Sequence, residues 1–253
     1  GLNPQQKNAG VYKNTDHKSL PFKVLNGNPG YINFLDAIYG YGLVNELGKT
    51  LGMVACASYK HTSPAGVGLG TPLSQLLQKV YMINKNLSPQ ASAFIKARNA
   101  DPLCSFGDFV AINDVVDVCM AEILVGYVSD GIVALGYEDG ALEILKKKKK
   151  GTYIILKAEN FENSGTEMRE LHGITLVQES NKQVTTFNSL SNIVTENKEL
   201  STQAKIDLIL ANTTCKYTQS NTIVAALNGQ VIGVGAGQQS RVDCMKLVKR
   251  KAL

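Results

Sequence analysis

The sequence predicts an α/β protein in which helices cover both faces of a central β-sheet. Short apolar runs alternate along the chain with segments whose apolar residues recur at helical spacing. Because the runs are apolar on both faces, they are typical of buried strands in a largely parallel sheet. With 253 residues, the chain is long enough for one large domain or two smaller ones with a sizeable core.

The first half contains the clearest alternation. The stretch YINFLDAIYGYGLVNELG, residues 31–48, has helical spacing, and the run MVACASY, residues 53–59, predicts a strand. A cap residue followed by proline predicts that further helices begin at Thr71 and at Ser88. The next elements are strands over 109–112, 132–135 and 153–156, with helices over 115–127 and 138–147 between them.

The second half is less regular. Residues 159–192 are polar and predict a linker or a loosely organised insertion. Ser201 is expected to cap a helix that runs through Thr214. Two β-rich runs then meet at Asn228 and Gly229, the preferred pair for a type I′ hairpin turn.

Composition narrows the class of protein. The formal charge of +5 equals the contribution of the lysine run at 146–150. This run follows LEIL and is expected to be a solvated helix end. A nucleic-acid partner is therefore not predicted. The 5 cysteines form no CxxC pair, which favours a reducing, cytosolic setting. The polar N-terminus and the absence of a long apolar run predict neither a signal peptide nor a membrane span.

Several other motifs have plain structural explanations. Gly233, Gly235 and Gly237 sit between a strand and a predicted helix, but their GxGxG spacing and the preceding hairpin disfavour a dinucleotide loop. A tight strand-to-helix turn that could hold an anion is the simpler interpretation. His17 and His172 have no carboxylate or cysteine at ligand spacing, so surface positions are expected for both.

The stretch SYKHTSPAGVG, residues 58–68, places Lys60 and His61 where an apolar strand meets a Pro/Gly loop. Adjacent residues of a strand point to opposite faces, so these two can share a task only if the chain leaves strand geometry there. The loop indicates that it does. Ligands collect at the carboxyl ends of strands in parallel sheets, where we expect this pair to lie.

Two acidic motifs are also predicted at strand junctions. SFGDF, residues 105–109, and SDG, residues 129–131, each pair a flexible glycine with an acid. Asp108 and Asp130 could both be ordinary turn residues, and for Asp108 that is the favoured interpretation.

Taken together, these motifs resemble a known family. LNGNPGYINFLDA, SYKHTSPAGVG, SFGDFVAINDVVDV, VSDGIVALGYEDGALEIL, KYTQSN and GQVIGVGAGQQSR are similar to the transformylase portion of the AICAR transformylase/IMP cyclohydrolase family, from Asn3 to about Cys244. The resemblance implies a cytidine-deaminase-like three-layer α/β/α fold, with a complete first unit over 1–164. Residues 165–253 would hold a linker and the start of a truncated second unit.

The resemblance also implies a reaction and a site. The reaction is formyl transfer from 10-formyltetrahydrofolate to the 5-amino group of AICAR, without a metal and in a cytosolic homodimer with shared sites. The implied catalytic residues are Lys60, His61 and Asn221, with His61 as the natural general base. The implied binding residues are Asn33, Gly107 and Asp130 on the nucleotide side, and Leu103, Phe106, Arg241 and Val242 on the folate side.

This chain departs from the family pattern in ways that leave an alternative open. Gln5 replaces the family's histidine in the NPHQ motif, and the preceding RYG and the rest of the second unit lie outside the chain. We therefore expect either an excised piece of the enzyme or a non-catalytic segment kept for dimerisation or ligand binding.

Overall fold

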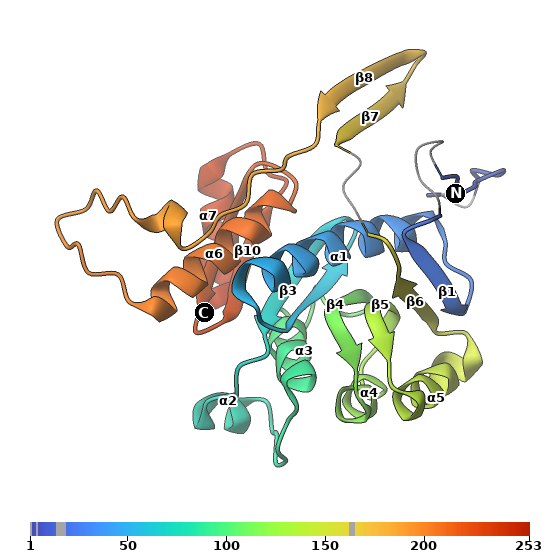
Figure 1. Cartoon of the computed structure of the whole chain (residues 1–253), viewed down its shortest axis with the longest axis horizontal. Coiled ribbons are helices and arrows are strands. Elements are labelled where there is room, and N and C mark those ends of the chain that lie inside the picture. The colour runs from blue at the N-terminus through green and yellow to red at the C-terminus, as the bar shows by residue number, and fades with distance from the viewer. Residues whose placement is uncertain (1, 4, 14–18, 162–164) are drawn as a thin grey trace.

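The fold is built on one large sheet. The computed structural model describes residues 2–3, 5–13, 19–161 and 165–253. Its 8-stranded sheet has the order β1-β6-β5-β4-β2-β3-β10-β9 (Figure 1). The strands are β1 (Phe22–Asn26), β2 (Ala55–Lys60), β3 (Ser63–Leu69), β4 (Asp108–Val116), β5 (Ser129–Tyr137), β6 (Ile154–Ala158), β9 (Thr222–Leu227) and β10 (Gln230–Ala236).

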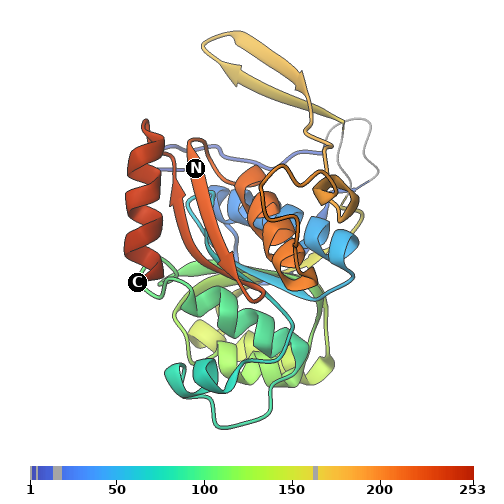
Figure 2. The same cartoon turned by 90° about the vertical axis from the view of Figure 1, so that its left-hand side faces the viewer.

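Helices cover both faces of this sheet, which confirms the predicted three-layer α/β/α arrangement. One face carries α1 (Tyr31–Leu51) and α6 (Thr202–Lys216), whose apolar residues share one core cluster. The other face carries α3 (Pro89–Asn99), α4 (Val118–Leu124) and α5 (Asp139–Lys147), and α7 (Arg241–Ala252) packs against the glycines of β10 (Figure 2). Among the described helices, none has the length and apolar character needed to cross a membrane.

Strand direction differs from the sequence prediction. Only the pairings of β4 with β5 and of β5 with β6 are parallel, whereas β1–β6, β2–β4, β2–β3, β3–β10 and β9–β10 are antiparallel. The sheet is therefore mixed, and the expectation of a largely parallel sheet holds for its β4–β6 part. Apolar residues on both faces reveal that a strand is buried, but they carry no information about its direction.

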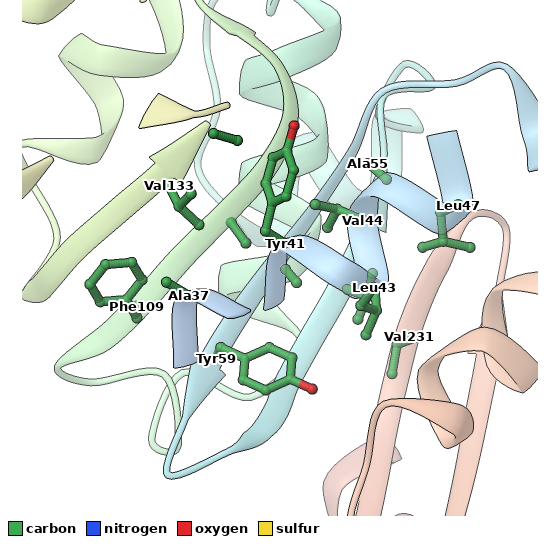
Figure 3. Packing of buried hydrophobic residues seen from close by; sticks show 14 of the residues in the cluster. Ala37, Tyr41, Leu43, Val44, Leu47, Ala55, Tyr59, Phe109, Val133 and Val231 are labelled. Carbon is green, nitrogen blue, oxygen red and sulfur yellow. The ribbon is translucent and has the colours of Figure 1, made fainter. Parts of the chain in front are cut away.

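The core beneath α1 positions the end of β2. Tyr59 is completely buried, and its hydroxyl donates to the carbonyl of Tyr217. Gly40 lets α1 approach closely, because a Cβ there would lie 3.0 Å from the Cβ of Ala111 and 3.3 Å from the Tyr59 ring. Figure 3 shows Tyr59 and Phe109 among the apolar side chains of this cluster. The residue next to Lys60 is thus fixed by close packing.

Helix boundaries follow local capping where no tertiary contact competes. Ser88 and Ser201 cap α3 and α6, as predicted. The helix expected from Thr71 is wrong: α2 (Gln75–Val80) is capped by Ser74 instead. The carbonyl and hydroxyl of Thr71 both accept from the buried Lys96 ammonium, at 2.8 and 2.5 Å, which holds Thr71 outside the helix.

The region between residues 159 and 192 is more ordered than predicted. It contains a two-stranded hairpin of β7 (Thr166–Leu171) and β8 (Ile174–Glu179), which projects from the body (Figure 1). His172 lies in its exposed turn, whereas His17 falls outside the described residues. The short 3-10 helices Lys148–Gly151 and Asn188–Leu190 complete the described elements.

The helix predicted over 115–127 also starts later than expected. β4 continues to Val116, and the side chain of Asp117 caps α4 by accepting from the amide of Met120 at 2.8 Å. The division at residue 164 remains a prediction. β10 extends the same sheet through Gln230, which pairs with Gly68 of β3.

The turn between β9 and β10 provides a test of the local chemistry. Asn228 and Gly229 have φ values of 50° and 75°, which confirms the predicted left-handed pair. We expect Gly229→Ala to lower the free energy of unfolding by about 1–2 kcal/mol, because a Cβ is disfavoured in this region. Urea denaturation would measure the change. Gly136→Ala is the matched control, since a Cβ there meets Val115 at an ordinary 3.5 Å; equal effects of the two substitutions would contradict the turn assignment.

Candidate functional site

The predicted motifs meet at one rim of the sheet. β2 ends there at Lys60, and because β2 is antiparallel to β4 and β4 is parallel to β5, both β4 and β5 begin at the same rim. Lys60 lies at the carboxyl end of β2 and His61 follows it, as expected, but β2 is antiparallel to both of its neighbours, so this rim is not the carboxyl edge of the parallel strands. The motifs at 105–109 and 129–131, however, lie at the amino ends of β4 and β5. Both motifs meet the end of β2 because β2 is antiparallel to the parallel strands β4 and β5.

His61 and Thr62 form a tight turn between β2 and β3. Lys60 pairs with Ser63, and the two turn residues have φ values of 52° and 63°. The chain therefore leaves strand geometry at His61, as predicted. Left-handed backbone costs roughly 1–2 kcal/mol for each residue with a side chain, and a β-branched residue such as Thr62 is a clear outlier. Such strain is typical of functional positions.

Asp36 of α1 holds this turn in place. Its Oδ1 accepts from the amide of Thr62 at 2.6 Å, and the amide of His61 is near enough to favour the charged form of the carboxyl. Burial raises the pKa of Asp36, while these two amides and the nearby His61 act in the opposite direction. Sequence reasoning missed Asp36. The available signal was an acid in the apolar stretch NFLDAIYG.

Lys60 is tied to the loop that precedes β4. Its ammonium donates to the carbonyl of Phe106 at 2.6 Å. Gly107 has a φ of 74°, and its amide donates to the carbonyl of Val128 at 3.0 Å, which joins this loop to the residues before β5. The side chains of Phe106 and Leu103 are 60% and 88% exposed, so the loop presents apolar surface beside the ammonium.

The predicted nucleotide-side residues lie on segments that reach the same rim. Asn33 lies on α1 three residues before Asp36, which places both on one helix face, and its Oδ1 accepts from the amide of Gly30 at 2.9 Å. Asp130 is close enough to Asp36 to affect its pKa. The structure thus brings Asn33, Gly107 and Asp130 to the rim that carries Lys60 and His61.

The lysine run contributes to this rim, which the sequence did not reveal. The ammonium of Lys149 donates to Asp130 at 2.7 Å, and both side chains are about half exposed. Lys148 reaches the carbonyls of Val125 and Tyr127 instead of solvent. The run is therefore only partly the solvated helix end that its composition suggested.

The remaining predicted residues lie farther along the same rim. β10 ends and β9 begins at this rim, so Asn221 is three strand positions from β2, and Arg241 and Val242 follow the loop after β10. The amide nitrogen of the Asn221 side chain donates to the carbonyls of Gln238 and Gln239 at 2.9 and 3.2 Å. Across the described ranges, no hydrogen bond or ion pair joins Asn221 or Arg241 to the Lys60–His61 pair.

Asp108 is not the ordinary turn residue that the sequence suggested. Its side chain is fully buried, it accepts from the hydroxyl of Ser58 at 2.5 Å, and the Nε of Arg98 lies 3.9 Å away. Burial raises its pKa to about 6, although Ser58, Arg98 and Ser129 favour the charged form. The sequence suggested a turn residue because Asp108 follows a glycine. Its side chain is instead surrounded by residues of β2, α3 and β5, which its neighbours in the chain do not reveal.

The described part of the chain contains no cluster of three or more His, Cys, Asp or Glu side chains suited to hold a metal ion. The donors at the rim are instead amides, an imidazole, carboxylates and ammonium groups. This set is suited to binding polar organic groups and to moving protons.

Comparison with known proteins places this site in a family context. The model of the AICARFT/IMPCHase bienzyme family matches residues 1–251. Similar proteins include the bifunctional purine biosynthesis protein PurH of Persephonella marina, 32% identical over 258 residues, and that of Chlorobium chlorochromatii, 33% identical over 259 residues. Both alignments cover 100% of this chain but only 45% of the relative.

The buried carboxyl of Asp108 predicts a specific pH dependence of stability. Its folded pKa of about 6 lies above the ordinary aspartate pKa of about 3.9, so between these values the folded state binds more protons than the unfolded state. The stabilisation is complete below about pH 4 and is lost as the pH rises through about 6. Relative to that of Asp108→Asn, the free energy of unfolding of the wild type should fall by about 3 kcal/mol between about pH 4 and about pH 7.

Urea denaturation of the two proteins across this pH range would measure the difference. The Arg98 contact that the substitution alters contributes a nearly constant offset, since arginine stays charged. Asp114→Asn removes a carboxylate from the same strand outside the cluster and serves as the matched control. A difference between Asp108→Asn and wild type that does not change with pH would show that the buried carboxyl is not perturbed.

Proposed function

The chain belongs to the AICARFT/IMPCHase bienzyme family, and we propose that it carries the formyl-transfer chemistry of that family in purine biosynthesis. The formyl group would pass from 10-formyltetrahydrofolate to the 5-amino group of AICAR and give formyl-AICAR. The observation that carries this proposal is the strained His61–Thr62 turn, held by Asp36 beside Lys60 at the rim. The chain spans about 45% of the length of the relatives it matches, so it would supply one part of the whole protein's activity.

The chemistry requires proton transfer at two nitrogens. The lone pair of the AICAR amine is delocalised into the ring, so the amine must lose a proton as it attacks the formyl carbon. His61 would accept that proton, because imidazole has a reference pKa of ~6.5 and is suited to general base catalysis near neutral pH. The new C–N bond gives a tetrahedral oxyanion. Its collapse breaks the bond to the folate nitrogen, which takes up a proton as tetrahydrofolate leaves.

Lys60 would stabilise the oxyanion and help to deliver that proton. Its ammonium is held by one carbonyl, Phe106 O, and keeps other donor capacity for a ligand. Asn221 is the second proposed donor, although its amide nitrogen donates to the loop carbonyls of Gln238 and Gln239. This role therefore requires the 238–239 loop to exchange those hydrogen bonds for the ligand's oxygen.

The rim provides two regions for the two substrates. Asn33, Gly107 and Asp130 would bind the nucleotide, because they lie at the rim that carries the turn and offer amide and carboxylate groups. Leu103 and Phe106 would contact the folate with exposed apolar surface, and Arg241 and Val242 would contact it from the start of α7. The proposed reaction uses no metal, and its partners are AICAR, the reduced folate and a second copy in a cytosolic homodimer.

Substitution of the catalytic pair tests the enzyme proposal. We expect Lys60→Ala and His61→Ala each to lower the rate of formyl transfer by at least roughly 100-fold, because each removes a proton-transfer or charge-stabilising group. The rate of tetrahydrofolate formation is the measurement, and circular dichroism checks the fold. Lys79→Ala, on α2, is the matched control. Formyl transfer that survives both changes would exclude the proposed mechanism.

The alternative is a segment that binds or dimerises without catalysis, and the observation that favours it is that the proposed donor Asn221 already donates to the carbonyls of Gln238 and Gln239. Isothermal titration with AICAR and with a folate analogue separates the two. We expect heat from both ligands, since both predicted regions lie on one rim. A chain kept only for dimerisation would bind neither ligand, and binding without turnover would indicate a binding-only segment.

A further inference from the structure

A cluster of buried polar groups lies directly beneath the loop that holds Lys60. Among the described residues, 4 buried side-chain atoms have no hydrogen-bond partner, and three of them are Arg98 Nε, Ser105 Oγ and Asp108 Oδ1. These three residues are adjacent: Arg98 Nε lies 3.9 Å from Asp108 Oδ2, and the amide of Asp108 donates to the carbonyl of Ser105 at 3.2 Å. Incompletely satisfied polar groups are rare in native interiors and usually mark a functional or hydrated position.

Two parallel links connect this cluster to β2. Ser58 and Lys60 are two residues apart on the strand, so their side chains lie on the same face. Ser58 Oγ donates to Asp108 Oδ2 at 2.5 Å, and Lys60 Nζ donates to Phe106 O at 2.6 Å. The loop from Ser105 to Asp108 is thus attached to β2 at both positions, and the first attachment depends on the Asp108 carboxylate.

The charged and titratable neighbours of Asp108 come from four elements. Arg98 of α3 provides a cation, and Lys148 after α5 exerts a weaker attraction on the same charge. Cys56 of β2 and Tyr153 before β6 are neutral neighbours whose own pKa values are raised, chiefly by burial. Burial dominates at Asp108 itself and raises its pKa to about 6, so its charge changes on the acid side of neutral pH.

We propose that Asp108 is a positioning residue that fixes the direction of the Lys60 ammonium through the loop from Ser105 to Asp108. Its ionised carboxylate accepts from Ser58 and anchors the end of the loop, and the Phe106 carbonyl then holds Lys60. Protonation weakens this anchor, so the loop and Lys60 loosen together at lower pH. The catalytic meaning of this device rests on the proposed formyl transfer, but the coupling itself is independent of any substrate.

Nuclear magnetic resonance of the labelled 253-residue chain tests the coupling without substrate. The carboxyl carbon of Asp108, the carbonyl carbon of Phe106 and the amide of Gly107 are followed from about pH 4.5 to about pH 8. A His61→Gln background removes the imidazole, since imidazoles also titrate near neutral pH. We expect all three signals to move with one midpoint near about 6.

Two variants and one control make the result decisive. Asp108→Asn should abolish the pH-dependent shift of the Phe106 and Gly107 signals. Ser58→Ala keeps the carboxyl but removes the donor of this anchor. It should raise the midpoint of the Asp108 carboxyl and reduce the accompanying shift of the Phe106 and Gly107 signals, so it still reports if Asp108→Asn fails to fold. Asp114→Asn, on the same strand, should leave the shift intact. Phe106 and Gly107 signals that do not follow the Asp108 carboxyl would overturn the proposal.

The outcome is distinct from that of the proposed function. A coupled titration in a chain without formyl transfer would retain the positioning device and remove the proposed activity. Formyl transfer with no coupled titration would retain the activity and remove the device.

Discussion

The rim depends on one interaction, between the Asp36 carboxylate and the Thr62 amide in the His61–Thr62 turn. The other two-residue turns that join paired strands, at 172–173 and 228–229, contain a glycine, which adopts positive φ at little cost. His61 and Thr62 lack that freedom and cost roughly 1–2 kcal/mol each. A hydrogen bond to a charged group contributes about 1.5–3 kcal/mol, so the bond from the Thr62 amide to Asp36 offsets much of this cost. The turn therefore keeps a histidine because α1 supplies a buried acid.

Local chemistry predicted a large part of the fold. Ser88 and Ser201 cap helices, and Asn228 and Gly229 form the turn, because the decisive contacts lie within a few residues. Thr71 has the same capping chemistry, but its carbonyl and hydroxyl oxygens accept hydrogen bonds from Lys96, which lies 25 residues further along the chain. Strand direction was unpredictable for a related reason: burial sets the apolar pattern, whereas long-range connections set the pairing.

The candidate site divides in the same way. Lys60 and His61 stand out because a basic pair at a strand end is chemically unusual, and this can be seen in the sequence alone. Asp36 and Asp108 cannot be identified from the sequence alone, because their roles exist only once α1 and β4 pack against β2. Asp108 even lies in a motif that predicts an ordinary turn. Supporting residues of this kind are defined by tertiary contacts rather than by their neighbours in the chain.

The two buried acids act from different elements on consecutive parts of the same segment. Asp36 orients the backbone after Lys60, and Asp108 anchors the strand before it through Ser58. Both carboxyls have raised pKa values, mainly because burial disfavours their charge, so each interaction has a cost in stability at neutral pH. Neutral hydrogen-bond partners would hold a purely structural strand end at a smaller cost in stability. The cost is understandable if the position of the Lys60–His61 pair, rather than the stability of the sheet, is what the rim preserves.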